Sequence, residues 1–173
     1  PNSLEHFDYD SMRWIQLHIR GNSAPATVHS VRIRRRRYPF ATEPAITITE
    51  PALQRLLDAC LQTVENGLQD TLVDCMGRER QQYSGDLGHE QLAAMSAFGE
   101  TRHCARYLRT YSEGQTSWGY FMDTWPATDR TNRIPQRLLG LTEWGPILDL
   151  SVQFIADNWN YVLFSGDRTG TDE

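Results

Sequence analysis

Residues 71–86 read TLVDCMGRERQQYSGD, a polar segment between two stretches with the apolar spacing of helices. Its charged side chains are Asp74, Arg78, Glu79, Arg80 and Asp86. The residues alone leave two interpretations open: a solvated surface connection whose acids and arginines pair, or carboxylates that converge on one pocket to do chemistry. The position of Asp86 just before a helical stretch is equally explained by capping of backbone N–H groups. On composition alone, the surface interpretation is favoured.

Helical periodicity continues on both sides of this segment. The stretches with helical spacing are 49–72, 88–100, 101–114 and 142–166. Thr49 and Thr142 are N-cap candidates, and Gly114 is a C-terminal stop signal. The last stretch is apolar over most of its circumference, so we expect neighbours on more than one side of it. Residues 115–141 read as a long irregular connection, and loops of that length in a compact domain are usually functional.

The segment before the first helix has the alternation of β-strands. In RWIQLHIRG (13–21) and in VHSVRIRRRRYPF (28–40), apolar residues alternate with polar ones, which predicts two strands. Strands followed by helices suggest two domains, so we assign residues 1–48 to β-structure and 49–173 to a mainly α domain. The run Arg34–Arg37 is interpreted as a solvated strand end, in preference to a phosphate-binding patch.

Composition excludes several classes of function. The chain has 173 residues, a net charge of −5 and a pI near 5.5, so we expect no nucleic-acid or acidic-membrane partner. It contains no lysine, which removes Schiff-base mechanisms. The cysteines, Cys60, Cys75 and Cys104, form neither a disulfide framework nor a zinc motif, and we expect no metal and no cofactor. Reduced thiols favour a cytoplasmic location; a secreted or periplasmic one stays open, because the chain begins at Pro1 and not at Met.

The segment DCMGRERQQYSGD (74–86) resembles the acidic motif of bacterial α-L-rhamnosidases, glycoside hydrolase family 78, written D-C-P-x-R-E-R-x-x-(aromatic)-x-G-D. Met76 stands where proline is usual, and Tyr83 occupies an aromatic position that is often tryptophan. The similarity continues in order along the chain, over 7–21, 34–40, 48–70, 132–136 and 147–167.

This resemblance implies a partial (α/α)6 toroid, the six-hairpin glycosidase fold, preceded by strands of a β-sandwich in residues 1–48. It implies hydrolysis of terminal α-L-rhamnosyl linkages with inversion, and Glu79 as the general acid. The expected substrate-binding residues are Asp74, Arg78, Tyr83, Asp86, Trp118 and Trp125. For Trp118 and Trp125 the alternative of packing tryptophans stays open, whereas His89, His103, Glu143 and Asp149 are explained as ordinary helix residues.

In this family the second catalytic carboxylate lies farther along than residue 173, and four helices cannot close a twelve-helix toroid. We therefore expect the chain to be part of a longer enzyme and to be inactive alone. The expected partner is a rhamnose-containing oligosaccharide, polysaccharide or glycoside; the aglycone and the oligomeric state are left open. Two alternatives remain: a non-catalytic carbohydrate-binding protein of the same fold, and a helical interaction domain.

Overall fold

The computed structural model describes residues 4–6, 9–21, 24–126 and 147–169, and the chain divides into two compact units. The first spans residues 1–36, and the second, which is helical, spans 37–173. No strand occurs in the described part of either unit, where β-pairing is limited to two isolated bridges. The mainly α class predicted from periodicity is confirmed.

The first unit has extended backbone without strand pairing in its described residues, so the two predicted strands are not present. A two-stranded ribbon is marginal unless a further strand or helix covers its apolar face. Here Leu17, Ile19 and Ile33 stay 52–70% exposed, which shows that their apolar face is uncovered. The assignment of residues 1–48 to a β-sandwich stays a prediction.

The helical unit begins at Arg37, before the boundary at residue 48 that the sequence suggested. Its first aromatic residues explain the difference, because they pack on helices of the unit. The ring of Phe40 stacks on Phe98 with centroids 4.0 Å apart, and Tyr38 lies edge-on to His103 at 5.0 Å. Arg37 itself pairs with Glu65 at 2.6 Å.

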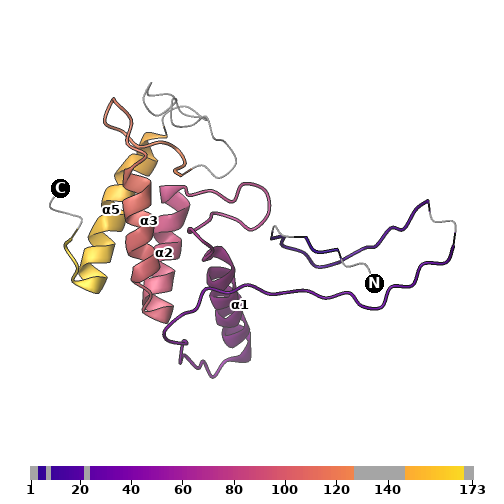
Figure 1. The fold of residues 1–173 in the computed structure, drawn as a ribbon. Coiled ribbons are helices and arrows are strands. Elements are labelled where there is room, and N and C mark those ends of the chain that lie inside the picture. The colour runs from indigo at the N-terminus through magenta and orange to yellow at the C-terminus, as the bar shows by residue number, and fades with distance from the viewer. Residues whose placement is uncertain (1–3, 7–8, 22–23, 127–146, 170–173) are drawn as a thin grey trace. The chain divides into compact units, whose positions relative to one another are not determined.

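Four helices make up the described part of this unit (Figure 1). They are α1 (Pro51–Gly67), α2 (Ser84–Phe98), α3 (Arg102–Ser112) and α5 (Leu148–Ser165). The N-cap of α1 is Glu50, whose carboxylate accepts a hydrogen bond from the Ala52 N–H, and not Thr49 as predicted. The C-cap of α3 is Glu113, one residue before Gly114, which the sequence suggested as the C-terminal stop. The predicted cap Thr142 lies outside the described residues.

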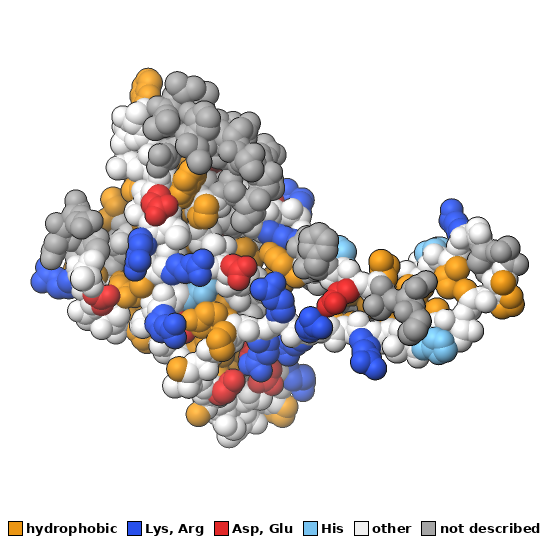
Figure 2. Space-filling model, in the orientation of Figure 1, with side chains coloured by type: hydrophobic (Ala, Val, Ile, Leu, Met, Phe, Trp, Pro, Cys, Tyr) orange, Lys and Arg blue, Asp and Glu red, His pale blue; other side chains and the backbone are white. Residues whose placement is uncertain are grey.

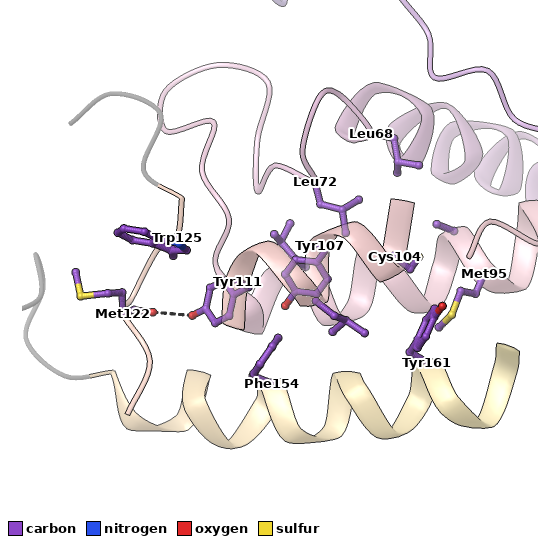
Figure 3. Close-up of a cluster of buried hydrophobic side chains, with 13 residues drawn as sticks. Leu68, Leu72, Met95, Cys104, Tyr107, Tyr111, Met122, Trp125, Phe154 and Tyr161 are labelled. Carbon is purple, nitrogen blue, oxygen red and sulfur yellow. Dashed lines mark hydrogen bonds between the residues drawn. The ribbon is translucent and has the colours of Figure 1, made fainter. Parts of the chain in front are cut away.

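Helix α2 packs against α1, α3 and α5, and the core lies where α2 and α3 meet α5. Figure 3 shows Phe154 of α5 directed toward Tyr107 and Tyr111 of α3, and the Phe154 and Tyr111 ring centroids are 4.9 Å apart. The Tyr111 hydroxyl donates a hydrogen bond of 2.7 Å to the Met122 carbonyl, which fixes the segment after α3 to the core.

Helix α5 packs through one face only in the described structure. Its residues Ile155, Trp159 and Leu163 remain 62–69% exposed, although we expected this helix to be covered on more than one side. The outer face of α1 is likewise open at Leu53 and Leu56. Periodicity identified these apolar faces correctly, but nothing in the described residues covers them.

Charges on the helical unit are mixed. On the face of the molecule that Figure 2 shows, basic side chains lie among acidic and apolar ones across this unit.

In the arginine run of the first unit, Arg34 pairs with Glu5 at 3.1 Å and is 83% exposed, which agrees with a solvated segment. Among the helices described, none combines the length and the hydropathy that crossing a membrane requires.

Candidate active site

A pocket of about 300 Å³ opens where the polar segment meets the starts of two helices. The residues that line it are Asp74, Glu79, Tyr83, Asp86 and Ile147. Its volume lies at the lower end of the range of small-molecule sites, roughly 300–1,000 Å³. The structure thus brings together four of the residues selected from the sequence.

The loop that carries Glu79 is closed by hydrogen bonds between its two ends. The Asp74 N–H donates to the Gln81 carbonyl at 3.0 Å, and the Gln81 N–H donates to the Asp74 carboxylate at 2.8 Å. Inside the loop, the Glu79 N–H donates to the sulfur of Cys75 at 3.3 Å. Arg80 adopts a left-handed backbone with φ 55°, a conformation that non-glycine residues rarely adopt. Glu79 is therefore held on a tightly constrained turn.

The other lining residues lie at helix starts. Tyr83 is the N-cap of α2, Asp86 lies in its first turn, and Ile147 is the N-cap of α5. The Ser84 hydroxyl donates to the Leu150 carbonyl at 2.6 Å, which joins the two helix starts. Asp86 thus lies at the N-terminal end of α2, where backbone N–H groups carry partial positive charge.

The surroundings of Glu79 favour its protonated form. A hydrogen bond with the Asp74 carboxyl, together with partial burial, raises the pKa of Glu79. The negative charges of Asp74 and Asp86 act in the same direction, because like charges disfavour ionisation. Arg78 opposes them from 2.5 Å, but its side chain is 82% exposed and its charge is screened by water. A carboxyl with a raised pKa is suited to general acid catalysis.

A comparison with protein-family models matches residues 44–169 to the bacterial alpha-L-rhamnosidase 6 hairpin glycosidase domain. The chain belongs to this family. Searches of curated proteins and of solved structures gave no match. This match confirms the resemblance to the rhamnosidase family and the helical fold that it implies. The matched range contains all the residues that line the pocket. Membership of this glycosidase family makes a glycoside the substrate class.

One carboxyl near this rhamnosidase-family pocket was missed by sequence reasoning. Glu90 lies one turn after Asp86 on the same side of α2, half-buried, with its carboxyl against Gly67 of α1. Burial, followed by the charges of Asp74 and Asp86, raises the pKa of Glu90 to about 8. The four-residue spacing from Asp86 was the available signal.

The remaining predicted residues lie away from the lining of the pocket. Arg78 extends into solvent beside Glu79, and Trp118 is 78% exposed in a turn after α3. Trp125 is buried in the core, and its carbonyl accepts a 2.7 Å hydrogen bond from the Gln82 side chain. This placement agrees with the packing alternative for Trp125. A role of either tryptophan in sugar binding stays a prediction.

The residues set aside as ordinary helix residues mostly fit that description. His103 is buried, and its Nε2 lies 2.9 Å from the Gln69 carbonyl; burial lowers its pKa, which favours the neutral ring. His89 is exposed on α2, and Asp149 lies in the first turn of α5. Glu143 lies outside the described residues.

A cation has one candidate set of ligands in the described chain. Ligand atoms of Asp74, Cys75 and Glu79 lie within 4.8 Å of one another. However, the sulfur of Cys75 and a carboxylate oxygen of Asp74 already accept backbone N–H groups. These two bonds, together with the hydrogen bond between the Asp74 and Glu79 carboxyls, account for the proximity of the three groups without an ion.

Proposed function

We propose that the protein containing this chain hydrolyses terminal non-reducing α-L-rhamnose residues from α-L-rhamnosides with inversion, using Glu79 as the general acid. One observation carries the proposal. In a chain of the bacterial α-L-rhamnosidase family, Asp74, Glu79, Tyr83 and Asp86 line one pocket of about 300 Å³.

Glu79 would donate a proton to the glycosidic oxygen as the bond to the sugar breaks. The Asp74 hydrogen bond and the neighbouring acids support this role, because they keep the proton on Glu79 at higher pH than an isolated carboxyl would. After donation, the Glu79 carboxylate is negatively charged, and Arg78 at 2.5 Å stabilises that state. The same arginine that opposes protonation thus assists the departure of the proton.

Asp74 and Asp86 would bind sugar hydroxyl groups. An ionised carboxylate accepts hydrogen bonds only, and such charge-assisted bonds are short and strong. Tyr83 would place its ring against the C–H groups of the sugar.

We place the catalytic base outside this chain, as the resemblance to the rhamnosidase family implies, and the geometry excludes Asp74 from that role. An inverting glycosidase needs a second carboxylate roughly 6.5–9.5 Å from the acid, with room for a water molecule between. Asp74 is hydrogen-bonded to Glu79 and leaves no such room. The 173-residue chain alone should therefore bind a rhamnoside without hydrolysing it.

The test is Glu79→Gln in the complete protein, with an aryl α-L-rhamnoside as substrate. Loss of a general acid should lower kcat by about 10²–10⁴. Glu113→Gln, at the exposed end of α3, is the matched control and should keep the wild-type rate. Proton NMR of the first product should show the β-anomer of rhamnose if the reaction inverts. Full activity of Glu79→Gln would remove Glu79 from the acid role, and binding without hydrolysis by the complete wild-type protein would favour a carbohydrate-binding protein.

A further inference from the structure

We propose that Ile147 recognises the C6 methyl group of the bound sugar and so selects a 6-deoxy sugar over its 6-hydroxylated counterpart. This inference rests on the function proposed above and adds to it the residue that sets sugar specificity.

The chemistry of the sugar defines what such a site needs. L-Rhamnose is 6-deoxy-L-mannose, so the two sugars differ by a single hydroxyl group at C6. A carboxylate beside C6 would favour the hydroxyl, because it accepts hydrogen bonds. A site that prefers the methyl group must instead present an apolar surface that leaves an added hydroxyl without a partner.

Ile147 is the aliphatic side chain among the described residues that line the pocket. The three carboxylates and Tyr83 come from the segment 74–86, whereas Ile147 comes from the start of α5. The apolar wall and the hydroxyl-binding acids therefore belong to separate elements of the fold. The ring of Tyr83 is a second apolar surface, but it carries a polar hydroxyl group, which Ile147 lacks.

The position of Ile147 is set by hydrogen bonds that run through Leu150. The Leu150 N–H donates to the Ile147 carbonyl at 3.1 Å, and the Leu150 carbonyl accepts from the Ser84 hydroxyl at 2.6 Å. Ile147 is thus tied to the start of α2, which carries Asp86. The apolar side chain of Ile147 is therefore held in the same pocket as the acids that would bind the sugar hydroxyls.

The expected selectivity follows from the size of the chemical difference. An apolar pocket rejects an isostere that adds one hydroxyl by about 10²-fold at most. We therefore expect the wild-type preference, expressed as the ratio of kcat/KM values, to lie at roughly 10–100-fold.

The experiment measures kcat/KM of the complete protein on p-nitrophenyl α-L-rhamnopyranoside and p-nitrophenyl α-L-mannopyranoside. Ile147→Val and Ile147→Thr form a matched pair, because Val and Thr have nearly the same shape and differ by a methyl-to-hydroxyl exchange. Thr is also a favoured N-cap residue, so the start of α5 tolerates it. The Val variant should keep the wild-type ratio within about threefold, and the Thr variant should lower it by about tenfold.

Equal ratios in the Val and Thr variants would overturn the inference and leave the proposed function standing. So would a wild-type protein that hydrolyses the rhamnoside without preference over the mannoside, a result that needs no variant. A complete protein that hydrolyses neither glycoside would overturn the proposed function together with this inference.

Discussion

Replacing Glu90 by glutamine should make the folded chain less sensitive to alkaline pH. The carboxyl of Glu90 is half-buried against Gly67, near Asp74 and Asp86, and these surroundings raise its pKa from 4.5 to about 8. The folded state therefore holds a proton that the unfolded state releases. The stability that this proton provides is fully present below pH 4.5 and is lost as the pH rises through 8.

The size of the effect follows from the two pKa values. At ~1.36 kcal/mol per pKa unit, a rise from 4.5 to about 8 corresponds to a loss of at most roughly 4–5 kcal/mol of unfolding free energy. Glutamine has nearly the shape of the protonated acid and cannot ionise. Glu90→Gln should therefore match the wild type near pH 5 and exceed it in stability by several kcal/mol near pH 9, because only the wild type must bury a charge there.

Urea unfolding of the 173-residue chain, followed by tryptophan fluorescence between pH 5 and 9, measures the difference. Glu113→Gln makes the same substitution at an exposed position and controls for the loss of a carboxylate as such. Parallel curves for Glu90→Gln and the wild type would refute the reasoning, since they would show that Glu90 ionises as easily in the folded chain as in the unfolded one.

Two further outcomes test the packing around the site. Gly88→Ala should lower the free energy of unfolding, measured in urea, by about 1–3 kcal/mol, because the added methyl group would overlap the carboxylate of Asp157, to which Tyr107 and Gln153 donate hydrogen bonds of 2.8 Å. The control Gly77→Ala adds its methyl group in open space and should lower the free energy of unfolding much less. Equal losses in the two variants would contradict this account. A thiol reagent at pH 8 should modify Cys60, which is exposed, and spare Cys104 until the chain unfolds, because burial raises the pKa of Cys104 to about 12. Modification of Cys104 at the rate of Cys60 in the native chain would show that the α3 core opens readily.

Much of the helical unit was predictable from sequence because helices leave a local signal. The apolar spacing identified all four described helices. The ends of these helices differed from the prediction where a contact made by a side chain outside the apolar pattern determines the residue at which the helix begins or ends. Helix α2, for example, starts at Ser84 because that buried residue bonds to Leu150 of α5, a contact far along the chain. The prediction of two strands was wrong for a related reason. Strand pairing depends on a further strand or helix that covers the apolar face, and period-two alternation does not specify that element.

The site was predictable to the extent that it lies in one continuous segment. Asp74, Glu79, Tyr83 and Asp86 all belong to the motif that carried the family resemblance, and the fold brings them to one pocket. Ile147 had no such signal, because it joins the pocket only through the packing of α5 on α2. Its contribution became visible only in three dimensions.

Methionine stands at position 76, where proline is usual in the motif. A proline would restrict the backbone of the turn and so reduce the entropy lost on ordering it. In this chain the turn is closed by the two hydrogen bonds between Asp74 and Gln81, and by the bond from the Glu79 N–H to Cys75. These bonds lie on both sides of Met76, whose sulfur contacts the Gln69 amide at 3.9 Å. Asp74 therefore acts twice in the geometry that presents Glu79: it is the hydrogen-bond partner of Gln81, and its carboxyl raises the pKa of Glu79.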